Sequence, residues 1–200
     1  MFAAVTLAVV LLAAAGCGSD KKPAATPPAK ATGATPAASG ASATPSGSPA
    51  ALIEFTVDGA GPYQLGTTLA SLQATKNLDE VATGGQVCPQ NTTARGTGTW
   101  KDIRLSFRSD GKLYLAVNRS TSIPTPSGAW LGTTLAQLKS IYAGVSGEEL
   151  AHGAGGGYLV TTLSGRGILF DLDANKKVIS MTAGDSAPLK ASYLGGTDFC

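Results

Sequence analysis

The single histidine of the chain, His152, precedes a run of small residues that could support acyl-transfer chemistry. The segment reads HGAGGG over residues 152–157. Backbone N–H groups in such a loop can stabilise an oxyanion, and an imidazole can act as a general base. A hydrolase of this kind also needs a nucleophile held beside the base. The segment therefore makes ester hydrolysis the first chemistry to consider.

HGAGGG resembles the glycine-rich oxyanion loop of lipases and esterases. That resemblance implies a G-x-S-x-G nucleophile turn and a second histidine, and the sequence contains neither. A phosphate-binding glycine loop would follow a strand and open a helix, whereas the expected order here is reversed. We interpret the segment as a flexible connection from a helix to a strand, and we predict no catalytic residue and no enzymatic activity.

Oxygen ligands recur at alternate positions in Asp171, Asp173 and Asn175, which is the spacing at the start of a calcium loop. The loop would continue with a glycine where the sequence has Lys176, and with a bidentate glutamate where it has Thr182. Asp171 is also expected in a strand. The pattern therefore favours a hairpin with an Asx turn.

The acidic pairs Asp79-Glu80 and Glu148-Glu149 are adjacent in sequence. Neighbouring side chains point in different directions on a helix or a strand, so we expect solvated carboxylates and no acid/base couple. One histidine is too few for a transition-metal site once the cysteines are engaged elsewhere. We predict no metal and no cofactor.

Five large aromatic residues could line a recognition surface or fill the core. Aromatic side chains are enriched at binding hot spots, but in a small domain they are more often buried. The sequence leaves the choice open for Trp100, Trp130, Tyr63, Tyr142 and Tyr158.

A nine-residue motif, called here the repeated phrase, occurs twice: LGTTLASLQ begins at Leu65 and LGTTLAQLK begins at Leu131. It indicates where helices begin. Thr68 and Thr134 are expected helix N-caps, and Gln137 has the spacing of a capping box. Leucines follow each cap at helical spacing. In the first copy Leu69 and Leu72 form the stripe, which Leu78 and Val81 could extend.

Alternating apolar residues after each helix predict antiparallel strands. The segment from Asp102 forms two strands around Ser-Asp-Gly, and the segment from Gly157 forms three. LIEFTV before the first helix adds another strand. The expected fold is α+β, with two tandem helix-plus-strand repeats at about 51–122 and 123–200 that give helices on one face of an antiparallel sheet, or two small sheets side by side.

The recurring glycine, Ser/Thr and Gln/aliphatic pattern resembles small tandem helix-plus-hairpin proteins. These include the secreted β-lactamase-inhibitor protein and the small lipoproteins of outer-membrane assembly. The resemblance covers residues 53–200, and Thr67 and Thr133 stand where the usual methionine would be. It implies an exported bacterial lipoprotein of this architecture.

The N-terminus carries an uncharged apolar run from Phe2 to Ala15, followed by Gly16 and Cys17. It is too short to span a bilayer, which takes roughly 20 residues, and its length suits a signal peptide. Ala14-Ala15-Gly16-Cys17 resembles the lipobox of bacterial lipoproteins, which implies cleavage after residue 16 and diacylglyceryl and palmitate chains on Cys17. A plain secretory signal or a short buried helix remains the alternative.

Residues 17–50 comprise the cysteine and a segment of Ala, Pro, Thr, Ser and Gly. Such a composition cannot bury enough apolar area to fold, so we predict a linker that holds a domain of residues 51–200 off the membrane. If Cys17 is lipidated, Cys88 and Cys200 remain as a disulfide pair in an oxidising compartment. The alternatives are two free thiols, or a reactive terminal cysteine that is used with a partner.

Charge excludes one class of partner. Only 14% of residues are charged, and residues 51–200 hold equal numbers of acidic and basic side chains, so no field favours nucleic acid. The sequence predicts a lipid-anchored, extracytoplasmic binding module with an unidentified protein or cell-wall partner. The alternatives are an inhibitor of a secreted or wall-acting enzyme and an enzyme of unseen type.

Overall fold

Antiparallel strands make up most of the folded chain. The computed structural model describes residues 52–86, 88–197 and 199, which belong to one compact unit, Ser48–Cys200. The predicted signal peptide (1–16), the lipidated cysteine and linker (17–50) and Cys200 lie outside the described residues. In chain order the elements are β1 (Phe55–Thr56), β2 (Gly59–Ala60), β3 (Tyr63–Gln64), α1 (Leu69–Ala74), β4 (Leu78–Thr83), β5 (Thr92–Gly96), a 3-10 turn (Gly98–Trp100), β6 (Ile103–Phe107), β7 (Leu113–Asn118), α2 (Leu135–Ile141), β8 (Ser146–Leu150), β9 (Gly157–Thr161), β10 (Arg166–Leu172), β11 (Val178–Asp185) and α3 (Ser186–Gly195).

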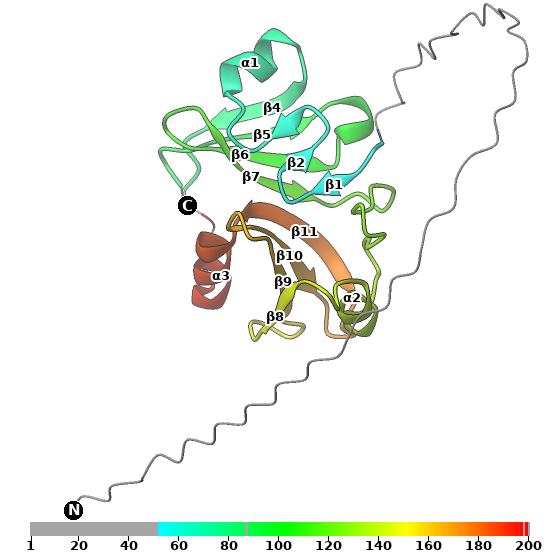
Figure 1. Cartoon of the computed structure of the whole chain (residues 1–200). Coiled ribbons are helices and arrows are strands. Elements are labelled where there is room, and N and C mark those ends of the chain that lie inside the picture. The colour runs from blue at the N-terminus through cyan, green and yellow to red at the C-terminus, as the bar shows by residue number, and fades with distance from the viewer. Residues whose placement is uncertain (1–51, 87, 198, 200) are drawn as a thin grey trace, which may run out of the picture. The chain divides into compact units, whose positions relative to one another are not determined.

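The strands form one large sheet and one small sheet. The large sheet has eight strands in the order β4-β5-β6-β7-β11-β10-β9-β8, and β1, β2 and β3 form the small one. Each half of the large sheet is a four-stranded meander, and the halves meet where β7 pairs antiparallel with β11 (Figure 1). The α+β class with antiparallel strands is therefore confirmed. LIEFTV supplies only a two-residue strand to the small sheet, and the two halves share one sheet instead of forming two.

The repeated phrase makes the same backbone contacts in both halves. Gly66 N–H donates to Leu113 O (2.7 Å) and Gly132 N–H donates to Val178 O (2.8 Å). Isolated bridges pair Thr68 with Lys112 and Thr134 with Lys177. Both glycines adopt a φ of +93°, a conformation that residues with a Cβ rarely adopt. The phrase thus fastens the start of each helix to the last hairpin of its half.

The predicted caps are confirmed. Thr68 accepts a hydrogen bond from Ser71 N–H, and Thr134 forms a complete capping box with Gln137. The predicted extension of the first helix is wrong, because Lys76 takes a left-handed φ of +55° just after the helix and such a residue ends a helix. Leu78 and Val81 lie in β4 instead.

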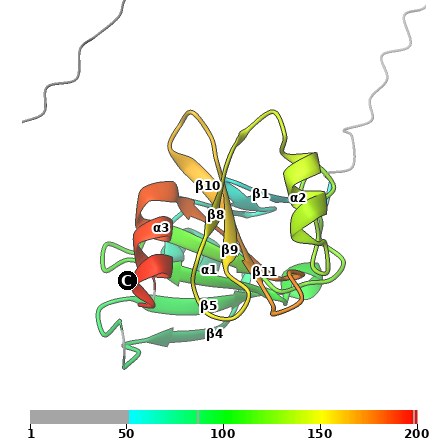
Figure 2. The ribbon, with the colours of Figure 1, turned by 90° about the horizontal axis from the view of Figure 1, so that it is seen from below.

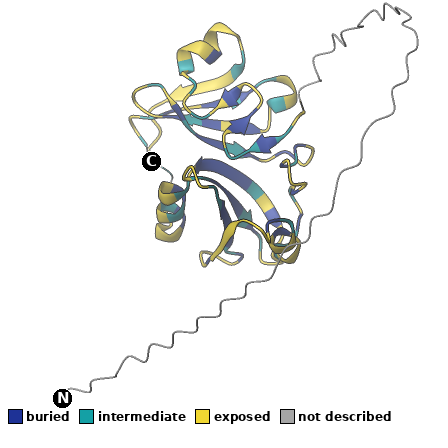
Figure 3. Ribbon diagram, viewed as in Figure 1, coloured by how far each residue is buried: buried dark blue, intermediate teal, exposed yellow. Residues whose placement is uncertain are grey.

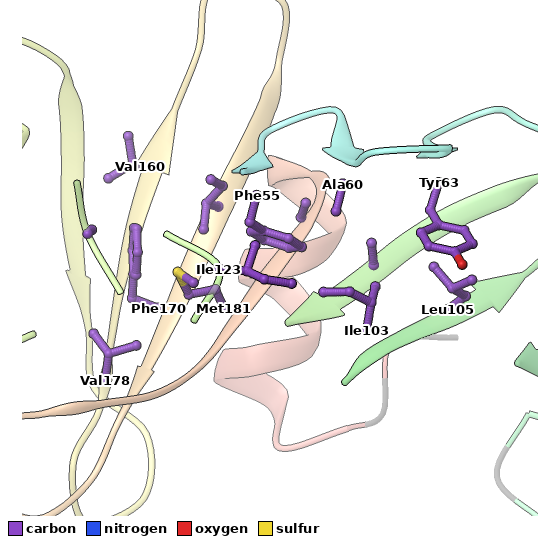
Figure 4. Packing of buried hydrophobic residues seen from close by; sticks show 14 of the residues in the cluster. Phe55, Ala60, Tyr63, Ile103, Leu105, Ile123, Val160, Phe170, Val178 and Met181 are labelled. Carbon is purple, nitrogen blue, oxygen red and sulfur yellow. The ribbon is translucent and has the colours of Figure 1, made fainter. Parts of the chain in front are cut away.

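The larger core lies on one face of the sheet, where the strands of both halves contribute alternate side chains. Leu105 of β6 lies beside Tyr63 of the small sheet, and Phe170 lies beside Met181 in the second half (Figure 4). Leu72 of α1 and Leu138 of α2 are buried in the same cluster. Each predicted helix therefore covers this face through its leucine stripe.

A second core lies on the opposite face of the sheet, under α3. Leu189 and Tyr193 of α3 are buried against Leu159 and Leu169, and the outward face of this helix is exposed (Figure 3). Figure 2 shows α2 and α3 at opposite sides of the second half. The two predicted helices, α1 and α2, share one face as expected, whereas α3 was not predicted and covers the other face.

The helices in the described ranges are short, and none is long and apolar enough to cross a membrane.

Candidate functional site

The glycine segment connects two strands and does not follow a helix as the sequence suggested. It joins β8 to β9. The sequence did not predict β8, because its residues, SGEEL, are mostly polar and lie exposed at the edge of the sheet. The His152 ring lies edge-on to Tyr193 with centroids 5.1 Å apart. Lys176 Nζ donates to Gly155 O at 2.8 Å, so this ammonium group is held by the backbone of the glycine segment.

A hollow of about 480 Å³ lies beside this loop. The described lining contains Glu149, His152 and Lys176 but no serine, threonine or cysteine. The glycine segment connects β8 to β9. The lining residues are Leu135, Glu149, Leu150, Ala151, His152, Gly153, Ala154, Gly155, Gly156, Gly157, Leu172 and Lys176.

Asp171 and Asp173, which have the spacing of calcium-loop ligands, have separate structural roles. Asp173 Oδ1 accepts hydrogen bonds from the N–H groups of Asn175 (2.8 Å) and Lys177 (2.9 Å), which is the predicted Asx turn. Asp171 lies in β10 and accepts a hydrogen bond from Tyr193 OH at 2.9 Å. The part of the chain that the structure describes holds no group of three or more His, Cys, Asp or Glu suited to a metal.

The acidic pairs form surface ion pairs. Glu148 is paired with Lys190 of α3 (2.6 Å) and Glu149 with Lys139 of α2, so these two carboxylates point in opposite directions as expected. Asp79 and Glu80 differ from the expectation, because both reach Arg95. Glu80 takes a φ of +49° within a bulge of β4, which turns its side chain toward the same partner.

Tyr193 joins α3 to the sheet through a neutral phenol. Burial raises its pKa, and the hydrogen bond to Asp171 and the charge of that carboxylate raise it further. Burial also raises the pKa of Tyr114 and Tyr142. Because the folded state holds these phenols protonated more strongly than the unfolded chain does, their stabilisation is complete below about pH 10 and is lost as the pH rises above it.

Tyr193→Phe should therefore flatten the alkaline loss of stability. Thermal unfolding of the wild type is expected to shift to lower temperature as the pH rises from 9 to 11.5. The variant should show a smaller shift over the same range, because it has one fewer phenol to ionise. Each protein's midpoint at pH 7 is its own reference. Equal shifts in the two proteins would contradict this assignment.

Cys88 is disulfide-bonded, and the chain's C-terminal segment lies nearby. Tyr114 OH donates to Phe199 O at 2.5 Å and accepts from Asn91 Nδ2 at 3.1 Å. Cys88, Tyr114 and Phe199 line one hollow of about 310 Å³. Phe199 precedes Cys200 in sequence, so these contacts support the predicted pairing of Cys88 with Cys200, which stays a prediction because Cys200 lies outside the described residues.

The structure separates the five candidate aromatic residues. Tyr63, Tyr142 and Tyr158 are buried in the core. Trp100 is partly buried, with its ring edge-on to Tyr63 at 6.3 Å. Trp130 alone among these five is exposed, with 56% of its surface accessible. A large aromatic side chain held in water is the feature most often associated with recognition.

Trp130 borders a depression of about 270 Å³, named here the Trp130 hollow. The lining combines an indole, one aliphatic side chain and three hydrogen-bonding side chains, and every lining residue is uncharged. The residues are Gly128, Trp130, Thr133, Gln137, Ser140 and Ile141. Three of them come from α2 and the others from the loop that precedes it.

Local hydrogen bonds fix the position of Trp130. The backbone N–H of Trp130 donates to Thr133 Oγ1 at 3.0 Å. The preceding turn is closed by Thr125, whose N–H donates to Ala129 O (2.7 Å) and whose buried hydroxyl lies 2.9 Å from Tyr142 OH. The loop is therefore attached to the core on both sides of the indole. Sequence reasoning could not identify this site, because the exposure of Trp130 depends on how the loop meets α2.

Comparisons with known proteins add little to this description. No protein-family model matches the chain, and no curated protein matches it. Among solved structures, an extracellular protein containing a SCP domain from Bacillus anthracis str. Ames is similar, with a TM-score of 0.43 and 8% sequence identity. The match covers 63% of this chain and 46% of that chain, so this chain spans less than half of that protein. A likeness at this level carries no functional argument.

Proposed function

We propose that this protein is a lipid-anchored, extracytoplasmic binding module of the cell envelope, and that the Trp130 hollow is its recognition surface. The observation that carries the proposal is an exposed indole that borders a hollow lined by uncharged hydrogen-bonding side chains. The N-terminal pattern supports the location, with an apolar signal, Cys17 as the lipid acceptor and a linker that gives the domain reach.

The repeated phrase supports a further part of the proposal, that the domain consists of two tandem units at about 51–122 and 123–200. The two copies share their helix caps and the hydrogen bonds between the phrase and the last hairpin. Corresponding positions then serve as internal controls. Trp130 corresponds to Gln64, Gln137 to Ser71 and Ser140 to Ala74.

Binding is favoured over catalysis because the candidate reactive groups have structural partners. Asp171 is bonded to Tyr193, and Lys176 to the glycine segment. The alternative role, inhibition of a secreted or wall-acting enzyme, would be favoured by an exposed aromatic patch on the sheet. The face of β5 and β6 opposite the larger core instead carries Thr93, Arg95, Arg104 and Ser106, since their neighbours in sequence are buried.

Site-specific crosslinking in the native envelope tests the proposal. A diazirine amino acid is placed at Ala136, one helical turn before Ser140, or at Ala70, the matching position of the first half. We expect crosslinks to an envelope component from position 136 and few from position 70. Trp130→Ala should reduce the yield at position 136 at least about tenfold, as for a hot-spot residue.

Gln64→Ala is the matched control, because Gln64 is exposed at the corresponding position of the first half. It should leave the yield at position 136 unchanged. A yield at position 136 that equals the yield at position 70, or that survives Trp130→Ala, would rule out the Trp130 hollow as the recognition surface.

A further inference from the structure

Hydrogen-bonding capacity remains unused at the Trp130 hollow. The Gln137 side-chain oxygen accepts from Thr134 N–H (2.9 Å) and from Thr134 Oγ1 (3.0 Å), which assigns the carbonyl end to the helix cap. The amide nitrogen of Gln137 and the hydroxyl of Ser140 have no hydrogen-bond partner among the described residues. Thr133 Oγ1 accepts from Trp130 N–H and keeps its own proton to donate.

The lining thereby specifies a kind of ligand. Because no charged side chain lines the hollow, an ionic ligand would lose water there without gaining a counter-charge. The indole offers a flat apolar face, and the three polar side chains offer donors and acceptors around it. A pyranose ring has the matching form, with C–H groups on its faces and hydroxyl groups around its edge.

Size favours the same ligand. At about 270 Å³ the hollow lies just below the range of roughly 300–1,000 Å³ for small-molecule sites. It suits one or two rings of a chain that continues into solvent. A protein partner would require an interface of roughly 800 Å² on each side, and the lining residues supply only a small part of that area.

Strand addition by a peptide is also disfavoured. The edge strand β4 is interrupted by the bulge at Glu80, and the other edge strand, β8, carries Glu148 and Glu149. Bulges and charges on edge strands discourage pairing with another chain. The main-chain route that extended peptides use is therefore obstructed at both edges of the large sheet.

We propose that the Trp130 hollow binds an uncharged sugar ring of an envelope glycan, with the ring stacked on the indole and its hydroxyls bonded to Gln137, Ser140 and Thr133. This inference rests on the proposed function and names its ligand class. The first half lacks the site, since Gln64, Ser71 and Ala74 replace the tryptophan, glutamine and serine.

The test titrates the full-length protein, held in a detergent without a sugar headgroup, with two probes. One is chitotriose, and the other is the neutral oligosaccharide fraction released from the host's own wall. Calorimetry and tryptophan fluorescence should report binding of at least one probe. Trp130→Ala should weaken it at least about tenfold, and Gln137→Ala several-fold. Gln64→Ala and Ser71→Ala should leave it unchanged.

Circular dichroism of each variant establishes that the fold persists, and Trp130→Phe keeps an aromatic face if Trp130→Ala does not fold. Binding that survives loss of the indole would overturn the assignment. If neither probe binds while the crosslink at Ala136 remains sensitive to Trp130, the ligand is not an uncharged sugar ring, and the proposed function survives without this inference. If the crosslink is also absent, both fail.

Discussion

Replacing Cys88 with alanine should lower the free energy of unfolding by about 4 kcal/mol. The residue is disulfide-bonded, and a bond to Cys200 would close a loop of more than 100 residues. The stabilisation arises because closing such a loop reduces the conformational entropy of the unfolded chain. In a domain of this size, a loss of about 4 kcal/mol corresponds to a fall of about 10 °C in melting temperature.

Loss of the disulfide in Cys88→Ala should affect the structure most at the C-terminal segment. Phe199 is held by the Tyr114 hydroxyl and packs against the smaller core under α3. Loss of the covalent bond should therefore loosen this segment first. Hydrogen exchange in Cys88→Ala should increase at the C-terminus before it increases in the sheet.

Cys200→Ala and the double variant identify the partner. Both should lose the same stability as Cys88→Ala, because all three remove one crosslink and the effects cannot add. Cys17→Ala is the matched control and should leave the melting temperature of the domain unchanged. If Cys200→Ala keeps full stability and peptide mapping still finds Cys88 in a disulfide, the predicted pairing is wrong.

Replacing Cys17 with alanine should move most of the protein from the membrane to the soluble fraction. Cys17 is the predicted lipid acceptor, and each buried methylene of its acyl chains contributes roughly 0.8 kcal/mol to membrane affinity. Two acyl chains give stable anchoring on this scale, and the predicted cleavage before Cys17 would remove the apolar run. The measurement is phase partition in a cloud-point detergent, combined with the intact mass of the mature chain.

Binding through the Trp130 hollow could retain the protein by another route, so the envelope is first treated with a glycan hydrolase. After that treatment the wild type should stay in the detergent phase and Cys17→Ala should not. Trp130→Ala should partition like the wild type. Undiminished detergent partition of Cys17→Ala would exclude lipidation at this residue.

The features that the sequence predicted are those set by short-range chemistry. Thr68 and Thr134 cap helices because a hydroxyl satisfies an N–H group three residues ahead. The hairpins of β6–β7 and β9–β11 follow from alternating apolar residues and from local turns such as that at Asp173. The first helix is shorter than predicted because Lys76, just after it, adopts a left-handed conformation. A lysine gives no sign of this conformation in the sequence.

The elements that escaped prediction depend on distant partners. β8 is a polar edge strand that exists because β9 pairs with it along its whole length. α3 carries a proline near its start and is placed by contacts of Leu189 and Tyr193 with the sheet. Such segments gain their stability from tertiary burial more than from propensity.

Residue types and their spacing were enough to predict the caps, the turns and the antiparallel strands, and they contain the pattern that predicts an anchored, exported chain. The tertiary structure alone decided that the two halves join through β7 and β11, and that Trp130 is exposed while Trp100 packs beside Tyr63. The two tryptophans are chemically identical, so their roles depend on what surrounds each indole. Whether one indole is exposed depends on the whole fold, which the residue type at that position does not encode.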